Sequence, residues 1–266
     1  MTHIDGPSDE WALGEALARS YLERVPPPDG WRERLCSLDL AYTAQDAAVK
    51  VLSSAGKGTV AGYKVGLTSK AMQRLCGIDT PICGCVLSND IHLNDVELRR
   101  DRYMHLGIES ELAFRMGRDI DRRVELSDND VLAAIASMHP AFEIVDDRNA
   151  NYARLSASEI IAENSWNVGI VLGEGVSPTA VAAIDRIQGQ YFENDEEIGG
   201  GSSADVLGNP LNVVRWLSQF LLARGSMLRA GDIVMSGSIV VTRFPPAGTA
   251  CRFVLDGLPA VTLRIA

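Results

Sequence analysis

The sequence predicts an α+β fold in which an N-terminal helical region precedes mostly antiparallel or mixed β-sheets. Apolar residues recur at helical spacing early in the chain, and from Val60 onward short apolar strands alternate with glycine-rich turns. The regular β-α-β rhythm of a doubly wound sheet is missing. We therefore expect an N-terminal helical region over residues 1–59 and a catalytic β-rich region over 60–266, joined in one compact unit.

Two helices are expected before the first strand. The first covers residues 8–24 and begins at Ser8, and the second covers 43–52 and begins at Thr43, since hydroxyl residues are favoured as N-caps. Later helices are expected over 69–75, from Ser127 onward with Asp130 completing a capping box, near 157–162, and from Gly208-Asn209-Pro210 to Gly225.

Strands are predicted wherever short apolar or alternating runs lie between turn residues. Residues 183–194 are expected to form a hairpin that turns near Gly189, and the run Gly199-Gly200-Gly201-Ser202-Ser203 is expected to be a loop. The other expected strands cover 61–67, 84–87, 107–116, 140–146, 167–173, 232–236, 250–255 and 260–265.

The composition excludes several classes of protein. The 266 residues carry 35 acidic and 25 basic side chains, a net charge of −10, which disfavours nucleic acid and anionic membranes as partners. No apolar run approaches the roughly 20 residues of a membrane span, and the segment 1–7 lacks the pattern of a secretion signal. We therefore expect a cytoplasmic protein.

Cysteine usage agrees with that expectation. The five cysteines are odd in number and irregularly spaced, which favours reduced thiols over a disulfide framework. Cys76, Cys83 and Cys85 could contribute to a zinc site, but a fourth ligand is not evident.

Three glutamates are the main candidate for chemistry. Glu109 and Glu111 share one parity of a predicted strand, so both side chains point to the same face, and Glu143 lies in a second apolar strand. Neighbouring carboxylates repel, and burying them requires a cation. An oxygen-only ligand set suits Mg²⁺ or Mn²⁺. The alternative is that Glu109 and Glu111 lie on a solvated face while Glu143 pairs with Arg148.

Three further residues are weaker candidates. Lys64, inside an apolar strand, either extends its ammonium group to solvent at a strand edge or is held against an anion in a cavity, where it could act as an acid or base. Asp79 is explained as a turn residue. His105 precedes Glu109 by four residues and could lie near a site, but a lone surface or half-buried histidine is the favoured explanation.

Motifs of other enzyme classes are missing. The sequence contains no G-x-G-x-x-G opening a helix, no P-loop, no G-x-S-x-G elbow and no paired histidine motif. Nucleotide-binding and serine-hydrolase functions therefore lose their main support.

Several segments together resemble the 2-keto-4-pentenoate hydratase and 4-oxalocrotonate decarboxylase family, a branch of the fumarylacetoacetate hydrolase superfamily. The similarity runs in order from about residue 60 to the C-terminus. It is carried by Tyr63-Lys64-Val65-Gly66-Leu67-Thr68-Ser69, Gly77-Ile78-Asp79 with Pro81, Glu109-Ser110-Glu111-Leu112-Ala113-Phe114, Pro140-Ala141-Phe142-Glu143-Ile144-Val145-Asp146, Gly208-Asn209-Pro210-Leu211-Asn212 and Gly231-Asp232-Ile233-Val234-Met235-Ser236-Gly237-Ser238.

The resemblance implies a mixed β-roll or barrel-like core and a small 2-oxo acid as substrate, held through its carboxylate and 2-oxygen. It also implies a homo-oligomer, or association with a related hydratase or decarboxylase. The residues that it implicates are Glu109, Glu111 and Glu143 as ligands of Mg²⁺ or Mn²⁺, Lys64 and Asp79 in catalysis, and Leu67, Asn164, Ser165 and Ser238 in substrate binding.

One departure from the family pattern concerns the substrate. Family members carry Asp-Asn-Ala-Ser-Ser where this chain has Glu163-Asn164-Ser165-Trp166-Asn167, and Ser238 is followed here by the bulky residues Ile239, Val240 and Val241. The expected activity is hydration of a 2-hydroxy-2,4-dienoate in the degradation of aromatic compounds. The alternatives are a 2-oxo-enedioate decarboxylase, a catalytically silent partner subunit, or an acylpyruvate hydrolase, for which an acid/base pair is not evident.

Overall fold

The computed structural model describes residues 8–122, 124–181 and 183–266, so the segment Met1–Pro7, with His3, lies outside the described residues. Its strands form two sheets. The strands are β1 (Val60–Gly66), β2 (Ile82–Leu87), β3 (Ile91–Leu93), β4 (Val96–Leu98), β5 (Leu106–Met116), β6 (Ile135–Asp146), β7 (Asn167–Leu172), β8 (Gln188–Glu193), β9 (Glu196–Ser202), β10 (Ile233–Arg243), β11 (Ala250–Leu255) and β12 (Val261–Ile265).

The larger sheet has seven strands in the order β2-β1-β10-β5-β6-β7-β3, and the smaller has five in the order β4-β12-β11-β8-β9. The pairs β1–β10, β3–β7 and β4–β12 are parallel, and the other pairs are antiparallel. The predicted α+β class with mixed sheets is therefore confirmed.

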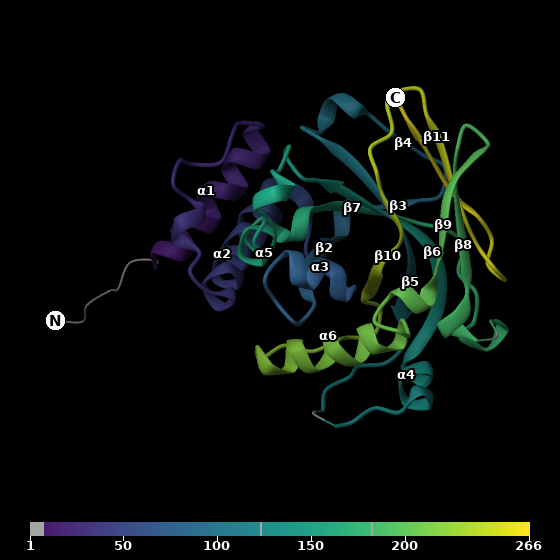
Figure 1. Cartoon of the computed structure of the whole chain (residues 1–266). Coiled ribbons are helices and arrows are strands. Elements are labelled where there is room, and N and C mark those ends of the chain that lie inside the picture. Colours follow the sequence, from purple (N-terminus) through teal and green to yellow (C-terminus); the bar gives the residue numbers. More distant parts are fainter. Residues whose placement is uncertain (1–7, 123, 182) are drawn as a thin grey trace.

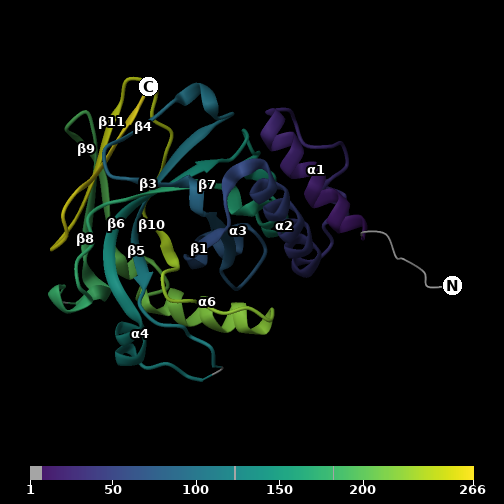
Figure 2. The same ribbon diagram turned by 180° about the vertical axis from the view of Figure 1, so that it is seen from behind.

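The helices surround the larger sheet. Figures 1 and 2 show α1, α2 and α5 together on one side of this sheet, with the smaller sheet on the opposite side and α4 and α6 below. The helices are α1 (Asp9–Glu23), α2 (Leu38–Leu52), α3 (Lys70–Leu75), α4 (Asp128–Ala134), α5 (Ala157–Ala162) and α6 (Leu211–Ala223), and two single turns, η5 (Tyr152–Arg154) and η6 (Asn164–Trp166), flank α5.

Most of the predicted helix starts are confirmed, but the start of α2 was predicted too late. Ser8 caps α1, and Ser127 forms a capping box with Asp130 at α4. The N-cap of α2 is Ser37, whose extended backbone lets its hydroxyl accept a hydrogen bond from the amide of Leu40. Thr43 lies inside the helix, where its hydroxyl donates to the carbonyl of Asp39.

The prediction for residues 183–203 was wrong in two respects. Gly189 lies inside β8, and the hairpin turns after Glu193, between β8 and β9. The glycine run pairs with β8 as part of β9, and at two of its positions other backbone comes too close for a side chain. A Cβ on Gly201 would lie 2.1 Å from the carbonyl oxygen of Ile239, and one on Gly200 would lie 2.7 Å from that of Gly189.

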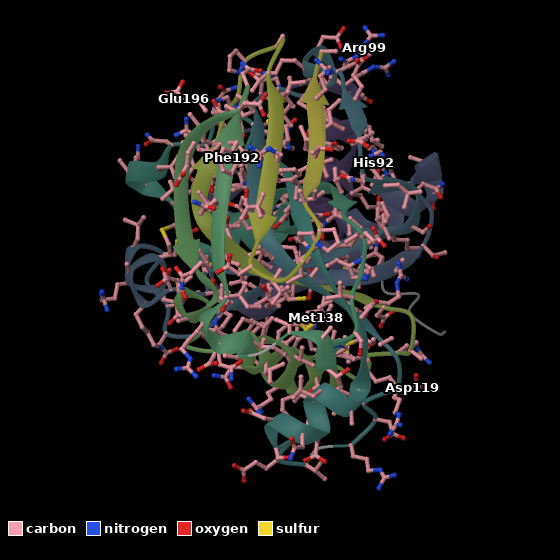
Figure 3. All side chains as sticks on the ribbon, turned by 90° about the vertical axis from the view of Figure 1, so that its right-hand side faces the viewer. His92, Arg99, Asp119, Met138, Phe192 and Glu196 are labelled. Carbon is pink, nitrogen blue, oxygen red and sulfur yellow. The ribbon has the colours of Figure 1, made fainter. Side chains whose placement is uncertain are left out.

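The two sheets pack face to face through one side of β5 and β6. Phe142 on β6 lies 6.2 Å, centroid to centroid, from both Tyr191 on β8 and Phe253 on β11. Figure 3 looks onto the smaller sheet from outside, with Phe192 of β8 and Glu196 of β9 labelled. The opposite face of β5 and β6 is lined near one end by a small apolar cluster that includes Ala113 and Ala141.

The larger sheet is curled but open. Its edge strand β2 contacts β7 and η6 without pairing to either as a strand. The link is made by side chains: Asn164 bonds to both the amide and the carbonyl of Cys85, and the Ser165 hydroxyl donates to the carbonyl of Cys83. The described strands therefore form two open sheets, and a closed barrel is not among them.

The N-terminal helices are attached to the sheet by buried polar contacts. Gln45 of α2 donates from its amide nitrogen to the carbonyls of Cys83 and Ile161, and the Tyr42 hydroxyl accepts the amide of Cys83. The division of the chain into an N-terminal helical region and a β-rich region near residue 59 stays a prediction. Within the described ranges, we find no helix that combines the length and the apolar character required to cross a membrane.

The contacts of Asn164 predict that Asn164→Ala destabilises the fold. The substitution leaves the amide and the carbonyl of Cys85 without their partner, so we expect a loss of about 2 to 3 kcal/mol in the free energy of unfolding. Urea unfolding measures this loss. The matched control is Asn89→Ala, since Asn89 is exposed and donates one bond to the carbonyl of Gly56. Equal losses in both variants would contradict the role given to Asn164.

Candidate metal centre

The three glutamates meet on one face of two paired strands. Glu109 of β5 lies directly opposite Glu143 of β6, and Glu111 follows on the same face. Each residue offers one carboxylate oxygen to a group whose atoms all lie within 4.8 Å of one another. Glu111 and Glu143 are buried and Glu109 is half-buried. The structure therefore brings together the three acids that the sequence singled out.

A hydrogen bond from a neighbouring strand orients each carboxylate. The amide of Gly237 donates to Glu111 Oε2 at 2.8 Å, and the hydroxyl of Thr242 donates to Glu109 Oε1 at 2.7 Å. The side-chain amide of Asn167 donates to Glu143 Oε1 at 3.0 Å. These donors leave other carboxylate oxygens unbonded, so the cluster retains acceptors for a further partner.

Gly237 can donate to Glu111 because it has no side chain. Its φ is +106°, a conformation that favours glycine, and a Cβ there would lie 2.7 Å from the side chain of Thr68. A larger residue would have to displace either this amide or Thr68.

Lys64 is held against the acids inside the fold. Its side chain is 7% exposed, and its Nζ lies 3.2 Å from Glu143 Oε1 and 3.1 Å from the carbonyl oxygen of Ser165, to which it donates. Of the two alternatives for Lys64, the structure supports the lysine held against an anion, and it excludes one that extends to solvent.

The alternative explanation for Glu143 is wrong. Glu143 pairs with Lys64, whereas Arg148 forms its ion pair with Glu163 at 2.6 Å. Arg148 also donates to the Ser20 hydroxyl and to the carbonyl of Val25, which ties the loop after β6 to α1 and the segment that follows it.

Burial controls the ionisation of this cluster. Desolvation, together with the neighbouring Glu143 and Glu109 carboxylates, raises the pKa of Glu111 well above its usual range. Desolvation also raises the pKa of Glu143 to about 7, although Lys64 opposes the shift. Burial alone would lower the pKa of Lys64, but the three carboxylates outweigh it and raise that pKa. Lys64 therefore keeps its charge beside the metal-free acids.

The cluster fits a divalent cation on two observations. Glu111 Oε1 and Glu143 Oε2 are buried oxygens with no hydrogen-bond donor in the described part of the chain. Such orphaned acceptors are costly unless another partner binds them. An all-carboxylate set of oxygens is the chemistry that Mg²⁺ and Mn²⁺ prefer. Glu109, Glu111 and Glu143 could hold such an ion.

The other predicted site residues lie at different distances from this cluster. Ser165 touches Lys64 through its carbonyl oxygen, and the Ser238 hydroxyl accepts the amide of Ser110, between the two β5 glutamates. Asn164 is occupied with Cys85. Asp79 is exposed in the turn after α3, and no contact within the described ranges links it to the three glutamates.

Left-handed backbone marks the turn beside Lys64. Asn164, Ser165 and Trp166 have φ values of 53°, 52° and 61°, and Leu67, just after β1, has a φ of 54°. Such conformations cost energy for residues with side chains and cluster at functional sites. This conformation places the carbonyl of Ser165 against the lysine ammonium.

The two departures from the family pattern have different consequences. Trp166 lies on the turn next to Ser165, where its ring packs 5.8 Å from the ring of Tyr152 and its Nε1 donates to Glu163. Ile239 and Val240 are buried in the main hydrophobic core, and Val241 is 84% exposed. Trp166 is therefore the departure that borders the site.

Sequence reasoning missed Thr242 and Asn167 as carboxylate partners, and it missed the pairing of His105. His105 Nδ1 lies 2.7 Å from Asp147 Oδ1, and the Tyr152 hydroxyl donates to Asp147 Oδ2 at 2.9 Å. Strand parity could have placed His105 on the face of Glu109 and Asp147 on the face of Glu143, but it does not determine which residues of the two strands meet.

The comparison with known proteins identifies the family. The C-terminal domain model of fumarylacetoacetate hydrolase matches residues 81–266. The chain belongs to the fumarylacetoacetate hydrolase family. Within it, the chain is 32% identical to the TodF product hydratase of Pseudomonas putida over 86% of this chain and 84% of that protein. It is also 32% identical to a 2-keto-4-pentenoate hydratase of Paraburkholderia xenovorans, over 76% and 74% of the two chains.

A solved structure has the same fold as this chain. The 4-oxalocrotonate decarboxylase of Pseudomonas putida G7, complexed with magnesium and adipate, superposes with a TM-score of 0.89. The similarity covers 100% of both chains at 24% sequence identity. The family model and the hydratase relatives confirm the resemblance deduced from the sequence. The structural match confirms a fold of the fumarylacetoacetate hydrolase type with helices and mixed sheets, whereas the expected barrel-like closure is not found among the described strands.

The raised carboxyl pKa values predict that metal affinity falls in acid. The metal-free folded protein binds protons on Glu143 between its ordinary pKa and about 7, so a cation must displace them. The folded metal-free protein holds the Glu143 proton more tightly than the unfolded chain does. The stability that this proton contributes is therefore lost as pH rises through that window. Calorimetric titration with Mn²⁺ should show affinity at least about tenfold weaker at pH 5.5 than at pH 7.5, with protons released. An affinity independent of pH would contradict this account.

Glu111→Gln separates metal binding from folding. A neutral amide of the same shape can still accept the amide of Gly237 and needs no proton to stay neutral when buried, so the metal-free melting temperature should be equal or higher. The rise in melting temperature on adding Mn²⁺ should be lost. Thermal melts with and without metal measure both effects. A variant that melts lower without metal, yet still responds to Mn²⁺, would show that Glu111 is structural.

Proposed function

We propose that this protein is a divalent-metal-dependent hydratase that adds water to a 2-hydroxy-2,4-dienoate and yields a 4-hydroxy-2-oxo acid. The observation that carries the proposal is the buried glutamate trio with two orphaned oxygens. Two relatives at 32% identity that match most of the chain are hydratases, one of them acting on 2-keto-4-pentenoate. Among these enzyme classes, hydro-lyase is therefore the best supported.

Glu109, Glu111 and Glu143 would hold Mg²⁺ or Mn²⁺, which would supply Lewis-acid stabilisation of the enolate formed from a 2-oxo acid. The protein prepares this position in advance. The donors of Gly237, Thr242 and Asn167 fix one oxygen of each carboxylate, and the second oxygens of Glu111 and Glu143 stay unpartnered for an ion to bind.

Lys64 is the residue that we propose to contact the substrate. Its ammonium group lies beside Glu143 in a buried position, where solvent screens its attraction for a substrate carboxylate only weakly. Its raised pKa suits a fixed cation better than a proton carrier. We keep Asp79 as the second candidate acid or base, which requires the exposed turn after α3 to approach the acids. Leu67, Asn164, Ser165 and Ser238 complete the proposed substrate-binding set.

We propose that the curled larger sheet of this chain corresponds to the roll or barrel-like core expected for the family. Side chains of η6 bridge its edge strand β2 to β7, which encloses Lys64 and Glu143. A homo-oligomer, association with a related hydratase or decarboxylase, and a cytoplasmic location stay predictions.

A 2-oxo-enedioate decarboxylase is the second candidate, because the full-length structural match is to a 4-oxalocrotonate decarboxylase with bound magnesium and adipate. The same acid cluster could serve either reaction, since both develop negative charge on the oxygen of a 2-oxo acid. The two activities differ in their products. Release of carbon dioxide from a 2-oxo-enedioate, without hydration of a dienoate, would select the decarboxylase.

The hydratase proposal predicts metal-dependent loss of the ultraviolet absorbance of a 2-hydroxy-2,4-dienoate. Glu109→Gln should reduce kcat/KM by at least about a thousandfold, because a ligand of the stabilising cation is lost. Absorbance assays with product analysis measure this, and Glu97→Gln, an exposed acid on β4, is the control. Unchanged turnover in Glu109→Gln would rule out the metal role, and failure of the protein to bind any divalent ion would revive the silent-subunit alternative.

A further inference from the structure

We infer that His105, backed by Asp147, forms a subsite for a second carboxylate at the far end of the substrate, so that the protein prefers dicarboxylic over monocarboxylic dienoates. This inference rests on the proposed function and specifies its substrate class. It is carried by the position of the pair on the strand face that holds the glutamates, by its hydrogen bonding, and by the apolar surface between them.

The pair lies one residue beyond the paired ends of β5 and β6. On one face of β5 and β6, Glu109 lies opposite Glu143 and Gly107 lies opposite Val145, and the next step outward joins His105 to Asp147. At about 3.3 Å per residue, four residues place His105 about 13 Å from Glu109 along the strand. The acid cluster and the His105–Asp147 pair are therefore held at a fixed separation along the same two strands.

Asp147 is a carboxylate that only accepts hydrogen bonds. Its side chain is 1% exposed, and it receives the amide of Asn149, the hydroxyl of Tyr152 and a ring nitrogen of His105. Because an ionised carboxylate only accepts, the hydrogen between the two side chains belongs to His105 Nδ1. The imidazole is thereby fixed in orientation, as in other carboxylate–histidine pairs.

The outer nitrogen of His105 is available to a ligand. The His105 side chain is 31% exposed, and its Nε2 has no partner in the described part of the chain. When the ring is charged, Nε2 carries a hydrogen and can donate a charge-assisted bond to a carboxylate, while Asp147 balances the charge from behind. Because the protein carries a net charge of −10, it repels a dianionic ligand overall. A local positive charge is therefore needed to hold the second carboxylate.

Apolar side-chain atoms cover the stretch between the two polar ends. Gly107 is buried there, since a Cβ on it would lie 2.6 Å from Val145 Cγ2 and 3.3 Å from Thr242 Cγ2. The ring of Phe244 stacks on that of His105 at 4.3 Å, and its edge lies 3.0 Å from where a Cβ of Gly107 would be. The exposed ring of Phe244 and the half-buried Thr242 thus border the stretch between His105 and Glu109. A hydrocarbon chain with a carboxylate at each end matches this order of polar, apolar and polar surface.

The distance between His105 and Glu109 indicates that His105 binds the far end of the substrate and does not take part in proton transfer. A group that moves protons at the reacting carbons must reach within about 3 Å of them, and those carbons lie next to the bound 2-oxo acid end. A seven-carbon dicarboxylic acid spans about 7 Å at roughly 1.2 Å per bond, and one polar contact of about 3 Å at each end brings the total to about 13 Å. A five-carbon monoacid would leave His105 unused.

Binding of unreactive saturated acids tests the subsite apart from catalysis. We would titrate the Mg²⁺-loaded protein with 2-oxoheptanedioate and with 2-oxopentanoate by calorimetry. The wild type should bind the diacid more tightly. His105→Ala should weaken diacid binding by about 10- to 100-fold, as expected for one charge-assisted hydrogen bond, and change monoacid binding by less than about twofold.

Further variants guard against a purely structural effect. His105→Lys keeps a cation and should retain part of the preference for the diacid, and His105→Gln replaces the alanine variant if that one does not fold. His92→Ala, which removes a half-buried histidine of β3, should change neither affinity. Equal weakening of both acids in the His105 variants, or a wild type without preference for the diacid, would overturn the inference.

Failure of the proposed function is a separate result. If the metal-loaded wild type hydrates neither a five-carbon dienoate nor a seven-carbon dienedioate, the hydratase assignment fails, while a diacid preference that depends on His105 would still establish the subsite. If hydration occurs but kcat/KM falls equally for both substrates in His105→Ala, His105 acts on the chemistry and the subsite is wrong.

Discussion

The burial of three carboxylates against one ammonium group is the constraint on which the rest of the site depends. Glu109, Glu111 and Glu143 would carry three negative charges if fully ionised, and Lys64 offsets one of them. The remaining imbalance is that of one divalent cation. Without it, desolvation drives protons onto the buried acids, as the raised pKa values of Glu111 and Glu143 show. Metal, protons and Lys64 therefore compete for the same few oxygens.

The curl of the larger sheet makes this burial possible. Lys64 comes from β1 and Glu143 from β6, and these strands are separated in the sheet by β10 and β5. A flat sheet would hold them about 14 Å apart, three strand spacings of roughly 4.8 Å. The curl and the left-handed turn at Asn164, Ser165 and Trp166 bring the ammonium to 3.2 Å from the carboxylate.

Local patterns predicted the elements well where one element determines its own geometry. Ser8 and Ser127 cap helices as expected, and strand alternation placed Glu109 and Glu111 on one face. Prediction failed where a distant segment decides. Gly199-Gly200-Gly201 is a loop by composition, yet it pairs with β8 as part of strand β9. Glycine is needed at Gly201 because the carbonyl of Ile239 in β10 leaves no room for a Cβ.

The same distinction applies to the candidate site. Charge in an apolar context singled out the three acids and Lys64, and the family resemblance then favoured a metal site over the alternative of a solvated face. The partners that orient these residues come from strands whose neighbours the sequence does not reveal. Thr242 reaches Glu109 from β10, and Asn167 reaches Glu143 from β7. The exposed position of Asp79 was also beyond reach, since a turn signal does not say which side of the molecule the turn occupies.

Strand register couples the site to the core. The face of β5 opposite the glutamates carries Ile108 and Leu112, which belong to the hydrophobic cluster between the two sheets with Phe142. A slip of one residue would move both glutamates into that cluster and place Ile108 and Leu112 beside Lys64. Because both errors are costly, the apolar face fixes the position of the acids to within one residue. The packing between the sheets, remote from any substrate, therefore sets the geometry of the proposed metal centre.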